Sequence, residues 1–304
     1  MITVFTPTFN RKDTLLRLYT SLLKQTFRDF EWIVLDDGST DDTEDLIRNW
    51  ALEGEILIKY HRVKNGGKHR AINKGLEIAN RELFFIVDSD DYLLENSLHL
   101  ILKYYYPIKD NDSIIGVTGF RVYPDGKLIG GKKFPNHITD SNLIERRSRY
   151  KVTADLAQVF KTKIFKEFLF PNIPDENFVA ESIVWNRMCI SYSMRYFNEA
   201  IYVGEYLEGG LSNNSVRNRR KNSQYSTLLY KELVSNPLAG IKLKLKSATN
   251  FWRFGFYRNK NIFKLFREIK NYKYSIICLF AGLCYYIKDS FKDEINIKTL
   301  NKRK

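Results

Sequence analysis

Residues 83–91 read LFFIVDSDD, an apolar run that ends in a cluster of acidic residues. The run Leu83–Val87 has the length and composition of a buried strand. The tetrad Asp88-Ser89-Asp90-Asp91 then packs carboxylates into a small volume, which is costly unless a cation or several donors lie among them. Such oxygen ligands suit Mg²⁺ or Mn²⁺, which usually bind through few carboxylates together with phosphates of a substrate.

A second acidic strand exit lies earlier in the chain, where Glu31–Leu35 leads into Asp36-Asp37-Gly38-Ser39. Strand and helix patterns alternate around both exits, and right-handed crossovers make such a sheet largely parallel. Both acidic clusters then lie on the carboxyl edge of one sheet, which is where open α/β sheets bind ligands.

The periodicity of apolar residues predicts the elements of this sheet. We expect strands at 2–6, 30–35, 56–61 and 83–87, and helices at 12–26, 69–79, 95–106 and from Ser39 or Thr40 to about Trp50. Ser39 is the expected N-cap of that last helix.

The pattern changes from about residue 113. Here we expect strands at 114–123, 128–134, 152–160 and 195–203, helices at 161–168 and 180–192, and a loop at 171–178. Beyond about residue 222 the sequence looks wholly helical. The expected fold is therefore α/β, with a Rossmann-like, mostly parallel sheet flanked by helices and a C-terminal helical extension.

Composition limits the class of protein. The chain has 304 residues, of which 44% are hydrophobic and 28% charged, so it is neither disordered nor an integral membrane protein. Its three cysteines are odd in number and lie in apolar surroundings, which predicts reduced, buried thiols in a cytosolic protein. The N-terminus enters a strand at once and leaves no room for a signal peptide. We therefore expect a cytoplasmic location.

The net charge of +14 is unevenly placed. Residues 213–304 contain 21 Lys or Arg against 5 Asp or Glu, whereas residues 1–212 contain 28 against 30. We therefore expect a near-neutral catalytic domain at 1–212 and a basic helical region at 213–304. Such a charge favours nucleic acid, anionic lipid or an acidic substrate. No RNA-recognition or zinc motif accompanies it, so no nucleic acid partner is expected.

Familiar phosphate-binding and nucleophile motifs are missing from the sequence. It has no Gly-x-Gly-x-x-Gly after the first strand, no P-loop and no Gly-x-Ser-x-Gly elbow. A carboxylate at a strand exit can accept the imide N–H of a uracil or the hydroxyls of a ribose. These residues suit a substrate that contains a nucleotide diphosphate, whose role as leaving group a divalent ion would stabilise.

Residues 6–47, TPTFNRKDTLLRLYTSLLKQTFRDFEWIVLDDGSTDDTEDLI, resemble the opening of the family 2 glycosyltransferases of bacterial capsular or exopolysaccharide type, which have the GT-A fold. The resemblance continues through residues 65–98, NGGKHRAINKGLEIANRELFFIVDSDDYLLENSL. It implies a nucleotide-binding half at 1–110 and an acceptor half at 111–212.

The same resemblance implies roles for single residues. Asp37 reads the nucleobase, and Thr6 and Pro7 wall the uracil pocket. The tetrad binds ribose and metal-diphosphate through Asp88, Ser89 and Asp90, with Mn²⁺ or Mg²⁺ on Asp90 and Asp91. Apart from the resemblance, Lys68 stands at the start of a predicted helix, from where it can reach a phosphate. Each of two residues keeps an alternative: Asp37 could instead be a turn former, and Lys68 a solvated side chain.

Residues 176–188, ENFVAESIVWNRM, are similar to a later acidic motif of the family. There a carboxylate acts as general base and an arginine follows six residues on, which implies Glu181 and Arg187. Ser182 replaces the more common Asp, so Asp175 or Glu176 remain alternatives for the base. Family membership implies inversion at the anomeric carbon, by a carboxylate that deprotonates the acceptor hydroxyl.

Two basic or apolar segments near the C-terminus each have two interpretations. The run Arg217–Lys221 is either a solvated charged loop or a mobile loop that closes on the donor diphosphate. Tyr274–Ile287 has 14 residues without charge, and as a helix of about 21 Å it is too short to span a bilayer. It is either a core helix or, with its flanking lysines, a helix lying on an anionic membrane surface.

The expected function is therefore transfer of a sugar from a UDP-sugar to an acceptor hydroxyl, with a lipid-linked saccharide as the expected acceptor. Two alternatives remain. One is a sugar nucleotidyltransferase, although its usual Gly-rich loop is missing after the first strand. The other is a non-catalytic, polyanion-binding peripheral membrane protein.

Overall fold

The computed structural model describes residues 1–205, 215–258, 261–269 and 272–301, without the side chains of Tyr272 and of residues 292–301. The chain divides into two compact units, one formed by Met1–Phe170 with Ala180–Leu207 and the other by Pro171–Val179 with Glu208–Lys304. The predicted boundary at residue 212 lies outside the described residues.

The first unit is built on a nine-stranded sheet with the order β3-β2-β1-β4-β8-β6-β9-β5, and β7 pairs with β9. The strands β3, β2, β1 and β4 are parallel, β8 is antiparallel to both its neighbours, and β6 is parallel to β9. The strands are β1 (Ile2–Thr8), β2 (Phe30–Asp36), β3 (Leu57–Arg62), β4 (Leu83–Ile86), β5 (Tyr92–Leu93), β6 (Ile114–Val122), β7 (Ile138–Ser141), β8 (Leu156–Lys161) and β9 (Ser193–Val203).

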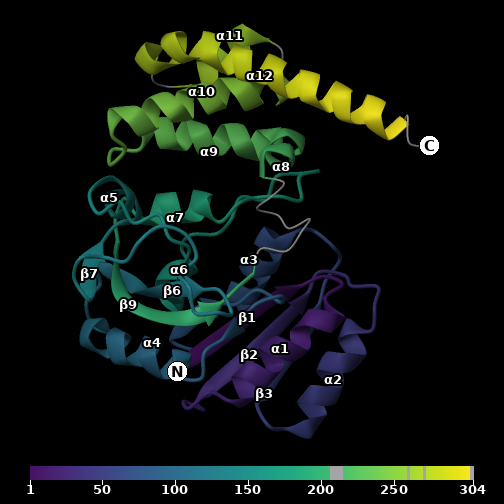
Figure 1. The fold of residues 1–304 in the computed structure, drawn as a ribbon, viewed down its shortest axis with the longest axis vertical. Helices are drawn as coiled ribbons and strands as arrows, with labels where there is room; N and C mark the ends of the chain where they lie inside the picture. The colour runs from purple at the N-terminus through teal and green to yellow at the C-terminus, as the bar shows by residue number, and fades with distance from the viewer. Residues whose placement is uncertain (206–214, 259–260, 270–271, 302–304) are drawn as a thin grey trace. The chain divides into compact units, whose positions relative to one another are not determined.

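Helices cover both faces of this sheet (Figure 1). Alternate strand residues such as Val4 and Trp32 point to one face, where they share a core with α1, α2 and α4. Phe5 points to the other face, where α3 approaches so closely that a Cβ at Gly75 would lie 2.1 Å from its ring. The helices are α1 (Lys12–Leu23), α2 (Thr43–Glu53), α3 (Lys68–Ile78), α4 (Ser97–Tyr105), η1 (Tyr106–Ile108), α5 (Leu143–Ser148), α6 (Thr162–Phe165) and α7 (Ser182–Met188).

The described part of the second unit is helical, as predicted beyond residue 222. Its core gathers on Trp252, whose indole N–H donates to Ser275 and whose ring packs against Phe266. Gly282 has no side chain to keep α12 away from Trp252. No helix among the described residues is both long and apolar enough to cross a membrane. The helices are α8 (Ser215–Lys221), α9 (Ser223–Ser235), α10 (Ile241–Arg258), α11 (Ile262–Glu268) and α12 (Tyr272–Asn301).

Some local predictions were wrong. Ser39 is not an N-cap, because α2 begins only at Thr43 and the Ser39 hydroxyl accepts the backbone N–H of Asn10. The run 128–134 forms no strand beyond a single bridge at Leu128, since Gly130 and Gly131 adopt positive φ angles of 65° and 59°.

Two further corrections concern the C-terminal region. The basic run Arg217–Lys221 is part of helix α8 and not a loop, because it continues into the helical pattern of the unit. Cys189 and Cys278 are buried as expected, but Cys284 is exposed because it lies on the side of α12 that faces away from Cys278.

Candidate functional site

Both acidic strand exits lie on the carboxyl edge of the parallel strands. Thr8, the last residue of β1, is paired with Asp36, and the backbone N–H of Asp37 donates to the Thr8 carbonyl. On the other side of β1, the chain passes from β4 into Asp88–Asp91, with the Val87 N–H bonded to the Phe5 carbonyl. Sheet order therefore places the two exits on either side of β1.

Lys68 connects the tetrad to the predicted base. It is the first residue of α3, and its ammonium lies 2.5 Å from Asp88 Oδ1 and 2.7 Å from Glu181 Oε1. Burial opposes the charge of Lys68, but the two carboxylates outweigh it and raise the pKa of Lys68. Burial likewise opposes the charge of Asp88, but Lys68 and Arg121 hold the pKa of Asp88 below its usual value. Lys68 and Asp88 are therefore charged at neutral pH, and Lys68 is held by ion pairs instead of being a solvated side chain.

Tyr202, a residue of β9, forms hydrogen bonds with two residues of the tetrad. Its hydroxyl accepts the backbone N–H of Asp88 at 2.9 Å and donates to Asp91 Oδ2 at 2.7 Å. Arg121 is paired with Tyr202 in the register of β6 and β9, and its guanidinium lies 4.0 Å from the centre of the tyrosine ring. The same guanidinium is 3.7 Å from Asp91. One aromatic side chain thus joins both ends of the tetrad to a buried cation.

Asp91 is only partly compensated by these neighbours. Burial raises its pKa to about 6, and the charge of Asp88 adds to this effect, although Arg121 and the Tyr202 hydroxyl oppose it. Asp90 is more open, with 27% of its side chain exposed, and Arg11 lies 3.7 Å from its carboxylate. Ser89 is buried, and its carbonyl accepts the Thr14 hydroxyl.

This cluster fits the metal that the sequence predicts. Among the described residues, no three His, Cys, Asp or Glu side chains are arranged to hold a metal ion by themselves. Mg²⁺ and Mn²⁺ do not require such a cage, since one or two carboxylates plus phosphate oxygens suffice. The pKa of Asp91 is raised first by burial and then by the charge of Asp88, and a divalent cation on Asp90 and Asp91 would stabilise the ionised carboxylate.

The first exit is arranged differently. Asp36 is fully buried and accepts the Ser39 N–H at 2.7 Å and the Tyr60 hydroxyl at 2.8 Å. The two oxygens of Asp37 accept the N–H groups of Gly66 and Gly67, each at 2.8 Å. Burial raises the pKa of Asp37, and these two bonds oppose the rise. Asp37 therefore fastens the loop that leads into α3, and each of its oxygens keeps a lone pair for a ligand.

The predicted pocket wall lies in β1. Pro7 is buried beside Leu35 in the pairing of β1 with β2. The Thr6 hydroxyl points into the core, where it accepts the indole N–H of Trp32 at 2.9 Å. The structure therefore does not bring the Thr6 side chain together with the acidic groups.

The candidates for the base differ in their surroundings. Glu181 stands at the N-terminal end of α7 with 32% of its side chain exposed, and Arg187 on the same helix donates to the Leu169 carbonyl. Glu176 is buried in the other unit, where its two oxygens accept the backbone N–H groups of Gln224 and Tyr225 at the start of α9. Asp175 lies in the loop before it, with φ of 62°. Glu176 thus serves as a helix cap, which leaves Glu181 as the better placed carboxylate.

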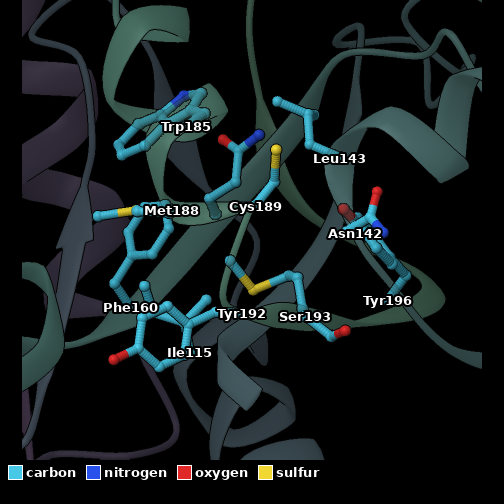
Figure 2. Close-up of a pocket in the computed structure, with 12 residues that line it drawn as sticks. Ile115, Asn142, Leu143, Phe160, Trp185, Met188, Cys189, Tyr192, Ser193 and Tyr196 are labelled. Carbon is cyan, nitrogen blue, oxygen red and sulfur yellow. The ribbon is translucent and has the colours of Figure 1, made fainter. Parts of the chain in front are cut away.

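A small cavity of about 40 Å³ lies behind α7, lined by Trp185, Met188 and Cys189 of that segment and by residues of β8 and β9 (Figure 2). Its lining is largely apolar and includes none of the predicted site residues. Trp185 stacks on Phe160 with ring centres 4.5 Å apart. Trp185 therefore packs against the core of the first unit.

Sequence reasoning missed Arg121 and Tyr202. Each lies within a predicted strand, but neither belongs to a motif, and they are far apart in the chain. Only the parallel pairing of β6 with β9 brings them together. A charged residue inside an otherwise apolar strand was the one available signal for Arg121.

The chain is similar to one known family and to several of its members. The family described as "Glycosyl transferase family 2" matches residues 3–168. The GalNAc(5)-diNAcBac-PP-undecaprenol beta-1,3-glucosyltransferase of Campylobacter jejuni is 26% identical over 292 residues, which cover 93% of this chain and 88% of that protein. The chain spans 72% of the glycosyltransferase GlyG of Streptococcus pneumoniae.

Solved structures share the fold. TarS 1-349 of S. aureus in complex with UDP-GlcNAc superposes with a TM-score of 0.61 at 19% identity, covering 94% of this chain and 81% of that one. The chain spans 43% of a longer TarS structure. The mannosyltransferase PcManGT of Pyrobaculum calidifontis, in complex with GDP-Man and Mn²⁺, gives 0.57 at 16% identity and covers 95% and 87%. These likenesses confirm the predicted GT-A fold.

Proposed function

Because the chain belongs to glycosyl transferase family 2, we propose that it moves a sugar from a UDP-sugar to a saccharide hydroxyl, with inversion at the anomeric carbon. Family membership makes the chain a glycosyltransferase and argues against the sugar nucleotidyltransferase and the non-catalytic protein. The observation that carries the finer proposal is the contact of Lys68 with both Asp88 and Glu181. It supports a diphosphate site and a base site that share one cation.

The tetrad is the proposed site of the donor diphosphate. Asp90 and Asp91 would hold Mn²⁺ or Mg²⁺, which as a Lewis acid stabilises the charge of the leaving diphosphate. Asp88 and Ser89 lie beside the ribose, and Asp37 with Pro7 lies at the nucleobase. UDP as the nucleotide and Mn²⁺ as the metal are supported by the neighbours TarS, solved with UDP-GlcNAc, and PcManGT, solved with Mn²⁺.

Glu181 is the proposed base. The acceptor oxygen forms the new bond at the anomeric carbon while the bond to the diphosphate breaks, and the hydroxyl proton passes to the Glu181 carboxylate. Without donor, Lys68 lies between Glu181 and Asp88. A bound diphosphate adds negative charge near Asp88, which draws Lys68 toward it and leaves Glu181 free to accept the proton.

The proposed acceptor is a lipid-linked saccharide in bacterial polysaccharide assembly. The name of the C. jejuni relative describes an undecaprenol-linked acceptor, and this chain aligns with 88% of that protein. An enzyme acting on such an acceptor works at the cytoplasmic face of the membrane. We propose residues 1–212 as its catalytic domain and 213–304 as the region that keeps it near the acceptor.

The donor assignment is tested by thermal unfolding with UDP, GDP or dTDP, each with and without Mn²⁺. A ligand that binds only the folded state raises the melting temperature. We expect a rise with UDP that grows with Mn²⁺. A rise with GDP or dTDP alone would overturn UDP as the nucleotide, and no rise with any of them would overturn the donor site.

The base assignment is tested by Glu181→Gln, with Glu77→Gln on the exposed side of α3 as the matched control. General bases contribute about 10²–10⁴-fold to rate. We expect Glu181→Gln to lose about that much sugar transfer while it keeps the response to UDP and Mn²⁺, and Glu77→Gln to keep both. Full transfer by Glu181→Gln would reject Glu181 as the base.

A further inference from the structure

Helix α12 is apolar on two opposite sides. One side packs into its own unit through Ser275, Cys278 and Gly282, which face α10. The other side carries large apolar residues at steps of three or four, which places them on one stripe of a helix. These residues are exposed by between 37% and 71%, and they are Ile276, Phe280, Leu283, Ile287 and Phe291, with Ile277 next to them.

The exposed apolar residues of this stripe are adjacent to one another and form a patch. Single exposed apolar residues are ordinary, but a contiguous apolar patch marks an interaction surface. Phe263 on the neighbouring helix α11 is 80% exposed, and α11 packs on the same core as α12 through Leu265 and Ile269. Figure 1 shows α12 as a long helix, so a stripe along it is extended.

The charges around the stripe are positive. Lys273 precedes it, Lys288 adjoins it, and both are exposed, as are Lys264 and Arg267 on α11. Two acidic residues nearby, whose side chains the structure describes, are paired within the unit. Asp289 accepts two hydrogen bonds from Arg253 at 2.6 and 2.8 Å, and Glu268 is paired with Arg258 at 2.5 Å. Among the side chains around the stripe that the structure describes, the exposed charges are therefore cations.

We propose that the outer stripe of α12 docks on an anionic lipid bilayer, with its apolar side chains among the acyl chains and its lysines at the headgroups. Membrane-surface helices combine these two features, and one of them alone gives weak binding. A second copy of the chain is a poorer partner, because two such stripes would bring lysines against lysines. The inference rests on the proposed function only in the choice of membrane, since it needs no property of the donor site.

Vesicle sedimentation tests the proposal with the full chain. The vesicles contain phosphatidylcholine alone or phosphatidylcholine with phosphatidylglycerol. The stripe variant combines Ile276→Ser, Phe280→Ser and Ile287→Ser, and the charge variant combines Lys273→Glu and Lys288→Glu. The matched control is Leu52→Ser, which removes a leucine that is 85% exposed on α2 in the other unit.

The wild-type chain and Leu52→Ser should bind the anionic vesicles and bind phosphatidylcholine far less. Both multiple variants should bind the anionic vesicles about tenfold less or weaker still. Melting curves and the response to UDP with Mn²⁺ show whether each variant folds and whether the donor site survives. Loss of vesicle binding with that response unchanged supports the proposal, and vesicle binding without any response to UDP overturns only the donor site.

Three results would overturn the inference. The wild-type chain could fail to bind either vesicle, or the stripe variant could bind as well as the wild type. In the third result, the wild-type chain is a dimer in sedimentation equilibrium and does not bind vesicles, and the stripe variant is a monomer. That result would assign the stripe to a second copy of the chain.

Discussion

The two acidic strand exits look alike in sequence but differ in the groups that surround them. Asp36-Asp37 follows β2 and Asp88–Asp91 follows β4, and both strands are parallel neighbours of β1. At the first exit neutral groups donate hydrogen bonds to the carboxylates: the Tyr60 hydroxyl and the backbone N–H groups of Ser39, Gly66 and Gly67. At the second exit the partners include Lys68, Arg121 and Arg11.

The difference indicates what each exit does. Neutral donors in fixed loops satisfy a carboxylate within the fold and hold the chain in place. Partly exposed cations, beside an acid such as Asp91 whose pKa is raised, are typical of a site that takes another charged species. The first exit therefore acts mainly as architecture, and the second is the proposed site of chemistry.

The largest effect on activity is expected from Asp90→Ala. It removes a proposed metal ligand with a partly exposed side chain and should lower sugar transfer by about 10²–10³-fold, with little change in the free energy of unfolding. The matched control is Asp42→Ala, because Asp42 is 70% exposed and forms its ion pair with Lys12 at the surface. If Asp90→Ala and Asp42→Ala transfer sugar equally well, the second exit is not the site of chemistry.

Asp36→Ala should do the opposite. It leaves the Ser39 N–H and the Tyr60 hydroxyl without their buried acceptor, which should lower the free energy of unfolding by about 3 kcal/mol. Urea denaturation measures this loss, and Asp36→Asn should recover part of it. An unchanged midpoint would show that Asp36 does not hold the first exit together.

A third kind of buried polar group is His69, which follows Lys68. Its side chain is 1% exposed and neither ring nitrogen has a hydrogen-bond partner in the described structure. Burial lowers the pKa of His69 to about 4, and the charge of Arg70 lowers it further. Because the unfolded chain takes up the proton near pH 6.5 and the folded chain does not, stability present above that pH is lost as the pH falls toward 4.

This loss can be measured by urea denaturation at pH 7 and pH 5. His69 should account for about 2 kcal/mol of the decrease in the free energy of unfolding between these two values. Between pH 7 and pH 5, the free energy of unfolding of His69→Leu should therefore fall by about 2 kcal/mol less than that of the wild-type chain. Equal losses in both proteins would mean that His69 is protonated in the folded state.

The smallest effect separates two tyrosines that each donate to an aspartate. Tyr202→Phe removes the bridge from the Asp88 N–H to Asp91, so binding of UDP with Mn²⁺ should weaken about tenfold. Tyr60→Phe removes a similar bond at the first exit and should change stability but not UDP affinity. Titration calorimetry on both variants decides the matter, and equal weakening would remove the distinction between the exits.

The sequence predicted the parts of this comparison that depend on local pattern. The apolar runs of β1, β2 and β4 and the acidic residues after them are contiguous, so their place at one edge follows from the alternating strands and helices. The GT-A fold is confirmed, together with the helical C-terminal region. Ser39 was misjudged because a serine before a helix can bond either to that helix or, as here, to a neighbouring loop.

The remaining features depend on contacts between distant segments. Arg121 meets Tyr202 only because β6 lies parallel to β9, and no periodicity in either strand reports that pairing. The same holds for Lys68 and Glu181, which lie on different helices. The partners of Asp36 and of Asp91, and hence the contrast between the two exits, were therefore beyond the reach of the sequence.

The central claim is that the second exit, and not the first, takes a divalent ion together with a nucleotide diphosphate. Electron paramagnetic resonance measures it directly, because it counts free Mn²⁺ in a solution of the protein with UDP. The account predicts that UDP makes the wild-type chain and Asp36→Asn bind Mn²⁺, and that Asp90→Ala binds much less. Mn²⁺ binding that is the same in Asp90→Ala as in the wild type, or that is lost in Asp36→Asn alone, would contradict it.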